Sequence, residues 1–312
     1  MTAFHMTTQA QGYSMNTADM TAKMAAGKGF IAALDQSGGS TPKALKGYGV
    51  EEGAWNTEEE MFGLIHQMRT RIISSPAFTG EKVLGAILFE RTMDGDVDGK
   101  PVPAALVEKG VVPFIKIDKG LEDEANGVQL MKPMPTLDDL LSRSKALGVY
   151  GTKERSVINS ANREGIAAVV KQQFEVGQQV LSHGMMPIIE PEVNIKSDTR
   201  AECDAILLDE ILKSLDDLPE GQQVMLKLSL PVVPGTFDAL VDHPKVLRVV
   251  ALSGGYQRPE ACVELAKNRG IIASFSRALL QDLRAPMSDA EFTGSLGSAI
   301  DDIYTGSTVK TA

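Results

Sequence analysis

Short apolar runs alternate with longer amphipathic stretches along most of the chain. The runs are rich in Ile, Val, Leu and Phe, as is typical of strands buried on both faces of a parallel sheet. There are about eight of them: residues 29–34, 83–89, 111–117, 149–151, 186–189, 224–230, 246–252 and 271–275. The fourth run is the weakest, because it is short and polar residues follow it directly.

Helical signals fill the stretches between the runs. Thr57-Glu58-Glu59-Glu60 has the spacing of a capping box and predicts a helix that continues toward Ile73. Apolar residues from 166 to 174 recur at i, i+3, i+4 and i+8, which is one face of a helix. We also expect an added helix around 17–26 and a late helix at 288–303. The residues after Ile303 are expected to form a polar, mobile tail.

A strand followed by a helix, repeated about eight times, is the pattern of a (β/α)₈ barrel. We therefore predict an α/β fold: one (β/α)₈ TIM barrel domain over residues 1–312, with an added N-terminal helix and C-terminal helices. No Ser/Gly-rich linker, low-complexity tract or fixed-period repeat divides the sequence. The weak fourth strand leaves a doubly wound open sheet as the alternative.

Charged and hydroxyl residues gather at the ends of the apolar runs, where barrel enzymes carry their catalytic groups. Charges buried there would cost several kcal/mol each unless they were paired. Their convergence on one rim therefore favours a functional site over a structural ion network. In chain order the sets are Asp35–Ser40, Glu90-Arg91, Lys116 with Asp118, Lys153–Arg155, Glu190 with Glu192, Lys227, Ser253–Gly255 and Ser274–Arg277.

Lys227 is the most informative of these residues, because it interrupts an apolar run. If the leucines on either side of it face the helices, its side chain faces the barrel axis. Desolvation and neighbouring cations such as Lys153 would disfavour the ammonium form. A neutral amine could then attack a carbonyl and form a Schiff base. The alternative is that Glu190 or Glu192 neutralises the lysine.

The Ser/Gly clusters suit a phosphate. Ser253-Gly254-Gly255 opens a loop between strand and helix, where free backbone N–H groups can hold an anion. Ser274 and Arg277 follow on the next strand, and barrels often bind phosphate at these last two loops. Residues 35–40, with Lys43, could serve a second anion across the mouth. A plain turn is the alternative for Ser-Gly-Gly taken alone.

Composition narrows the classes of function. Lys and Arg number 31 against 41 Asp and Glu, a net charge of −10, so we expect no nucleic-acid partner and no membrane partner. Two cysteines and four scattered histidines show no metal-ligand spacing, and the nucleotide-binding glycine motifs are missing, so no metal and no cofactor are predicted. Residues 1–27 show no signal-peptide pattern. We expect a cytoplasmic protein and, on base rates, a homo-oligomer.

Seven segments, in this order, resemble class I (Schiff-base) fructose-bisphosphate aldolases of bacterial type. They are residues 27–37, 112–120, 153–155, 187–192, 226–227, 252–255 and 274–279. The resemblance implies a TIM-barrel lyase of glycolysis and gluconeogenesis that needs no metal. It would reversibly cleave a sugar bisphosphate, fructose 1,6-bisphosphate, to dihydroxyacetone phosphate and glyceraldehyde 3-phosphate through a lysine Schiff base.

The resemblance also implies roles for individual residues. Lys227 would form the imine, and Glu190 would act as the general acid and base. The other catalytic residues would be Asp35, near the cleaved bond, Lys153 as a second lysine and Glu192 as a further carboxylate. Ser253, Gly254 and Arg277, with Ser274 beside them, would hold one phosphate, and Lys116, Arg155, Ser37 and Ser40 would face the other end of the substrate.

The sequence departs from the animal pattern of this family. Gln36 stands where that pattern has Glu, Lys227 is followed by Leu-Ser-Leu rather than Pro-Asn-Met, and the chain does not end in tyrosine. Tyr304 lies near the end, and we assign it no role. Three alternatives stay open: an imine-forming enzyme of the transaldolase or deoxyribose-phosphate type, a sugar-phosphate-binding scaffold without turnover, and a metal-dependent aldolase.

Overall fold

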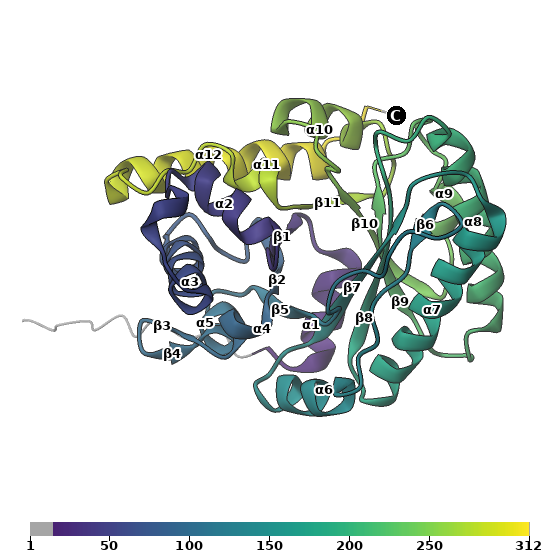
Figure 1. Cartoon of the computed structure of the whole chain (residues 1–312), viewed down its shortest axis with the longest axis horizontal. Coiled ribbons are helices and arrows are strands. Elements are labelled where there is room, and N and C mark those ends of the chain that lie inside the picture. Colours follow the sequence, from purple (N-terminus) through teal and green to yellow (C-terminus); the bar gives the residue numbers. More distant parts are fainter. Residues whose placement is uncertain (1–14, 312) are drawn as a thin grey trace, which may run out of the picture.

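The computed structural model describes residues 15–311 and contains a closed barrel of eight parallel strands surrounded by helices (Figure 1). The strands pair in the order β1-β2-β5-β7-β8-β9-β10-β11, and β11 pairs back with β1. Their bounds are β1 (Phe30–Leu34), β2 (Val83–Leu88), β5 (Val112–Lys116), β7 (Gly151–Ile158), β8 (Met186–Val193), β9 (Val224–Ser229), β10 (Val246–Leu252) and β11 (Ile272–Phe275). The predicted TIM barrel is confirmed, and the open-sheet alternative is wrong.

Helices and short hairpins connect the barrel strands. The helices are α1 (Thr17–Ala26), α2 (Ser40–Tyr48), η1 (Glu52–Ala54), α3 (Glu58–Ser74), α4 (Glu90–Met93), α5 (Val102–Glu108), α6 (Leu137–Ala146), α7 (Arg163–Ser182), α8 (Arg200–Asp217), α9 (Asp238–Val241), α10 (Arg258–Ala266), α11 (Arg277–Leu280) and α12 (Asp289–Thr308). β3 (Asp96–Val97) pairs with β4 (Lys100–Pro101), and β6 (Val128–Gln129) pairs antiparallel with β7. The predicted capping box is present, since the Thr57 side chain accepts from the Glu60 N–H and the Glu60 carboxylate accepts from the Thr57 N–H.

The strands separate two apolar regions. The larger one lies between the strands and the helices, and the smaller one fills the barrel with side chains such as Ile31, Phe114 and Met225. Met20 and Met24 of α1 belong to this inner cluster, so the added N-terminal helix packs against the barrel interior. Side chains on a strand alternate between the two regions. The inward positions therefore run from apolar residues deep in the barrel to polar residues at the carboxyl ends of the strands.

The fourth barrel strand differs from its prediction. The apolar run at 149–151 marks only its beginning, and β7 continues to Ile158. Lys153 and Arg155 therefore lie within the strand rather than after it. The apolar pattern failed here because this strand places polar side chains at buried positions, with Lys153 only 2% exposed and Glu154 fully buried.

The C-terminal segment is also more ordered than predicted. α12 extends past Ile303 to Thr308, and Gly306 and Ser307 are buried within it. The Ser307 hydroxyl accepts a hydrogen bond from the Ala273 N–H at 3.1 Å, which ties the helix to β11. The expectation of a mobile tail is wrong for these residues, because Gly306 lets the helix pack closely against Cys262.

Tyr304 lies on α12 away from the carboxyl ends of the strands. Its ring faces the Lys82 ammonium at 5.8 Å, just before β2 begins. In the part of the chain that is described, no helix is both long and apolar enough to span a bilayer. Residues 1–14, half of the stretch in which no signal peptide was expected, lie outside the described residues.

Candidate active site

A cavity of about 1080 Å³ opens at the carboxyl ends of the barrel strands. Its walls include residues from all eight of the strand ends and loops that the sequence singled out. The thirteen predicted site residues all line it: Asp35, Ser37, Ser40, Lys116, Lys153, Arg155, Glu190, Glu192, Lys227, Ser253, Gly254, Ser274 and Arg277. The structure thus brings together residues spread over more than 240 positions of the sequence, and their individual roles stay predictions.

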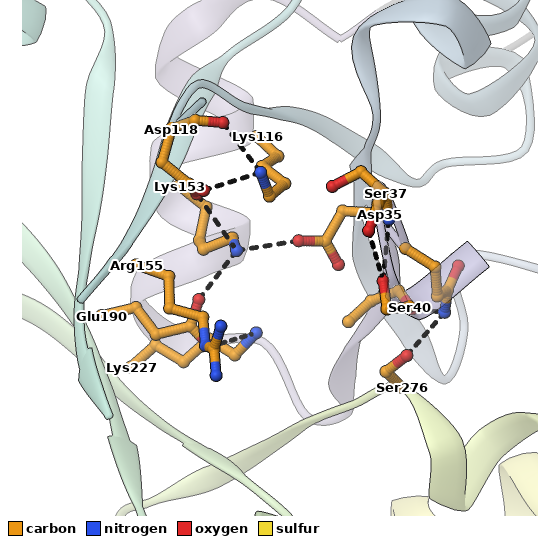
Figure 2. Close-up of polar contacts among 12 residues, drawn as sticks. Asp35, Ser37, Ser40, Lys116, Asp118, Lys153, Arg155, Glu190, Lys227 and Ser276 are labelled. Atoms are coloured by element: carbon orange, nitrogen blue, oxygen red, sulfur yellow. Dashed lines mark hydrogen bonds and ion pairs between the residues drawn. The ribbon is translucent and has the colours of Figure 1, made fainter. Parts of the chain in front are cut away.

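Lys153 is the centre of the buried charge cluster. Its ammonium lies 2.8 Å from a carboxylate oxygen of Asp35 and 2.8 Å from one of Glu190 (Figure 2). A third carboxylate, that of Asp118, is 3.9 Å away. Asp35 directly follows β1 and Asp118 follows β5, whereas Lys153 and Glu190 lie within β7 and β8. Their side chains meet in the cavity.

Lys227 contacts the same cluster from β9. Only 4% of the residue is exposed, and its ammonium lies 2.8 Å from Glu190 Oε1. Glu190 therefore bridges two lysines, one through each carboxylate oxygen. This contact is the one foreseen in the alternative that a carboxylate neutralises Lys227, and the same contact gives the lysine a proton acceptor within hydrogen-bond distance.

The cluster fixes the charge of its members. Burial alone would raise the pKa of Asp35 and of Glu190, but Lys153 and Lys227 outweigh it and hold both pKa values below their usual range. Burial would lower the pKa of Lys153, and Asp35 and Glu190 raise it above its usual value instead. At neutral pH the site therefore holds two carboxylates around a protonated Lys153.

Lys116 and Arg155 are each paired with a carboxylate. Lys116 lies 2.7 Å from Asp118 Oδ1 and also donates to the Asp118 carbonyl at 2.8 Å. Arg155 pairs with Glu192, the carboxylate two residues beyond Glu190 on β8. Asp118 was quoted in a motif but not predicted as a site residue, although its i+2 spacing from Lys116 placed both on one face of the chain.

The loop after β10 is shaped for close approach of an anion. Gly254 and Gly255 have φ angles of +60° and +133°, which favour glycine. A Cβ at Gly255 would meet an Arg277 guanidinium nitrogen at 3.3 Å, so the glycine leaves the arginine its space. Within residues 15–311, Arg277 has no carboxylate partner, and its charge is free to meet a phosphate.

The Ser37–Ser40 loop lies beside the loop that carries Arg277. β1 pairs with β11, and the Gln36 side-chain amide donates to the Ser276 hydroxyl at 2.5 Å. Figure 2 shows Ser37 and Ser40 on the same side of the mouth as Ser276, with Arg155 on the other side. The ring closes between the first and last strands, so this loop is adjacent to the loop that carries Arg277, and its assignment to the other end of the substrate stays a prediction.

Two buried groups secure the loop that follows Lys227. Arg200 of α8 donates to the Leu230 carbonyl and, at 2.9 Å, to the Tyr256 hydroxyl. Asp204, one turn further along α8, accepts from the Val232 N–H at 3.1 Å. Burial raises the pKa of Asp204 to about 6, although Val232 and Arg200 partly oppose the shift.

Asp204→Asn is expected to remove a pH dependence of stability. A carboxyl with a raised folded-state pKa favours the folded state when protonated, so its stabilising contribution is present below the usual carboxyl pKa and is lost as pH rises toward about 6. The change amounts to up to ~3 kcal/mol for a shift of about two units. Urea unfolding of both proteins from pH 4 to 7 measures it, and parallel curves would contradict the assignment.

Across residues 15–311, the His, Cys, Asp and Glu side chains do not form any group of three or more that could hold a metal ion.

A family model and two solved structures are similar to this chain. The model of the glycolytic fructose-bisphosphate aldolase class-I family matches residues 16–233. A structure of fructose-bisphosphate aldolase from Plasmodium falciparum, in complex with TRAP and a small-molecule inhibitor, is similar with a TM-score of 0.77, 20% identity and 95% of each chain covered. At that identity the similarity supports the barrel fold alone. The family match ends before β10, so Ser253, Gly254, Ser274 and Arg277 lie beyond it.

A structure of an orotidine-monophosphate-decarboxylase from Toxoplasma gondii is also similar, with a TM-score of 0.44, 10% identity and coverage of 96% of this chain and 98% of the other. A similarity this low supports no inference.

Proposed function

The chain belongs to the class-I fructose-bisphosphate aldolase family and is thus an aldolase, and on that premise we propose that it cleaves fructose 1,6-bisphosphate through a Schiff base on Lys227. The observation that carries the proposal is the bridge of Glu190 between Lys227 and Lys153, at 2.8 Å to each. It supplies a nucleophile, a proton acceptor and a fixed positive charge in one buried cluster.

Imine formation begins with transfer of a proton from the Lys227 ammonium to Glu190. The neutral amine then attacks the C2 ketone, and the proton on nitrogen moves to the former carbonyl oxygen. Glu190, now a neutral acid, returns its proton to the departing hydroxyl, and water leaves. The products are a protonated imine on Lys227 and a carboxylate on Glu190, so the charges balance.

Cleavage follows from the imine, which acts as an electron sink. A carboxylate, Glu190 or Asp35, takes the proton of the C4 hydroxyl, and the C3–C4 bond breaks. Glyceraldehyde 3-phosphate leaves, and the enamine on Lys227 is protonated at C3 and hydrolysed to dihydroxyacetone phosphate. Protonated Lys153 stabilises the carboxylates through these steps, an electrostatic contribution that the dry site strengthens.

The substrate class follows from the polar walls of the cavity. Arg277 and the Ser253–Gly255 loop lie on one part of the wall, and Lys116 and Arg155 lie on strands farther round the ring. Both regions carry cations, with Lys116 and Arg155 also paired to Asp118 and Glu192, and two such regions suit two phosphates. This separation favours a bisphosphate over the monophosphates of the transaldolase and deoxyribose-phosphate types, and a binding scaffold would not need the lysine–carboxylate bridge.

Reduction with borohydride in the presence of fructose 1,6-bisphosphate is expected to trap the substrate on the peptide containing Lys227. Mass spectrometry of the digest locates the modified residue. The kcat/KM for the bisphosphate is expected to exceed that for fructose 1-phosphate and fructose 6-phosphate, and activity should survive a chelator. Trapping on another lysine refutes the proposed mechanism, and a preferred monophosphate refutes the substrate.

A further inference from the structure

Arg69 is a buried cation outside the catalytic cluster. It lies on α3, its exposed fraction is 0%, and within the described residues no carboxylate pairs with it. Its guanidinium instead donates to the Thr92 hydroxyl at 2.7 Å and to the Gln36 carbonyl at 2.5 Å. Burying a guanidinium without an ionic partner lowers the folding stability, and an apolar side chain of similar size would fill the same space without that loss. Folding stability alone therefore does not account for an arginine at position 69.

Gln36 extends the contacts of Arg69 to the last strand of the barrel. Its side-chain oxygen accepts from Arg69 at 3.1 Å, and its side-chain nitrogen donates to the Ala33 carbonyl at 3.1 Å and to the Ser276 hydroxyl at 2.5 Å. An amide can accept and donate in this way, whereas a carboxylate could not donate to a carbonyl. This explains why glutamine suits position 36.

The linked residues stand next to proposed site residues. Gln36 lies between Asp35 and Ser37, and Ser276 directly precedes Arg277. Thr92 belongs to α4, which follows β2. Hydrogen bonds link Thr92, Arg69, Gln36 and Ser276 in series, and we call this series the Arg69 clamp. It joins the carboxyl ends of three neighbouring strands, β2, β1 and β11.

We propose that Arg69 is a positioning residue for the aldol reaction: through the Arg69 clamp it holds Asp35, the Ser37–Ser40 loop and Arg277 at the spacing that the substrate needs. The part of this inference that concerns the aldol reaction rests on the proposed function. Arg69 itself is not among the residues that line the cavity. Burial lowers the pKa of Arg69 to about 10, partly offset by Asp35, so the guanidinium stays charged at neutral pH.

Arg69→Met, Ser276→Ala and the double variant test the clamp through kinetics. Arg69→Met is expected to lower kcat/KM for fructose 1,6-bisphosphate by ~10–100-fold, and Ser276→Ala by ~10-fold, since misplaced positioning groups cost about this much. The double variant should be no worse than Arg69→Met, because both changes break one linkage. Arg69→Lys should not restore the rate, because the compact ammonium lacks the planar fork whose two terminal nitrogens reach Thr92 and Gln36 separately.

Hydrogen exchange supplies a readout that needs no turnover. Peptides covering residues 35–44 and 274–281 should exchange faster together in Arg69→Met and in Ser276→Ala. Arg248→Met is the matched control. Arg248, which is half-buried, also donates its guanidinium to carbonyl groups, those of Ala25 and Gly27 at 2.7 and 3.2 Å, but beside α1. Its loss should lower the melting temperature without changing exchange at the mouth.

The outcomes separate the clamp from the proposed function. Unchanged kcat/KM in Arg69→Met, additive losses in the double variant, or mouth peptides that respond equally to Arg248→Met each overturn the clamp. If Arg69→Met does not fold, Ser276→Ala and Arg69→Lys carry the same tests. The proposed function is refuted if the wild-type protein does not cleave the bisphosphate. If peptides 35–44 and 274–281 still exchange faster together in Arg69→Met and Ser276→Ala, that result supports the clamp independently.

Discussion

Replacement of Lys227 by methionine is expected to abolish borohydride trapping of the ketose and to lower kcat by about 10⁴-fold or more, a loss typical when a covalent nucleophile is removed. Methionine has nearly the length of lysine and fills the same buried position, but it offers no nitrogen to the C2 carbon. Steady-state kinetics and mass spectrometry of the reduced adduct measure the two effects.

Two control variants separate the loss of the nucleophile from the loss of charge and from the loss of any lysine. Lys227→Arg keeps a cation beside Glu190, so the buried carboxylate stays paired, yet the guanidinium does not form an imine; it should be as inactive as the methionine variant. Lys213→Met removes an exposed lysine that pairs with Glu210 at 2.8 Å, and it should retain activity. A trapped adduct in Lys227→Met would show that another lysine is the nucleophile.

Lys153→Met should produce the second largest loss of activity, together with a loss of folding stability. The change leaves Asp35 and Glu190 buried without the cation that lies 2.8 Å from each. Breaking a buried pair by removing one partner costs ~3–5 kcal/mol of folding stability. Loss of the fixed charge should lower kcat by ~10²–10⁴-fold, the range of a positioned acid, base or electrostatic group.

The pH dependence of Lys153→Met has a definite sign. In the wild-type protein the pKa values of Asp35 and Glu190 are depressed, so their stabilising contribution is present above the usual carboxyl range and disappears as pH falls through the depressed values. Without Lys153 burial raises both pKa values, so the acid limb of the kcat/KM profile should move to higher pH. Rate profiles and urea unfolding across the acidic range measure both shifts.

A double variant separates electrostatics from packing. Asp35→Asn in the Lys153→Met background removes the carboxylate that is left without a cation, since Glu190 keeps its contact with Lys227. Stability should return toward the wild-type value, while activity should stay low because both the cation and a carboxylate are missing. If the double variant is less stable than Lys153→Met, the stability loss comes from packing and the electrostatic account is wrong.

The sequence predicted which residues would meet at the mouth of the barrel because the signal is local, and the thirteen predicted residues all line the cavity. A polar side chain at an inward position near the end of an apolar strand stands out, as Lys227 and Glu190 do, and i+2 spacing tells which neighbours share its face. Arg69 gave no such signal. It lies within an amphipathic helix, where an arginine is expected to be exposed. Only the packing of α3 against the loop that follows β1 buries it.

By itself, the sequence determined the barrel, its strand order in outline and the charged residues that reach its mouth, because side-chain alternation and helical periodicity depend on near neighbours in the chain. The tertiary structure decided which charges pair. It placed Glu190 between two lysines, set the Ser37–Ser40 loop beside β11 and extended β7 through buried polar positions. These features arise from contacts between residues far apart in the sequence, where ring closure and burial, rather than local pattern, fix the distances.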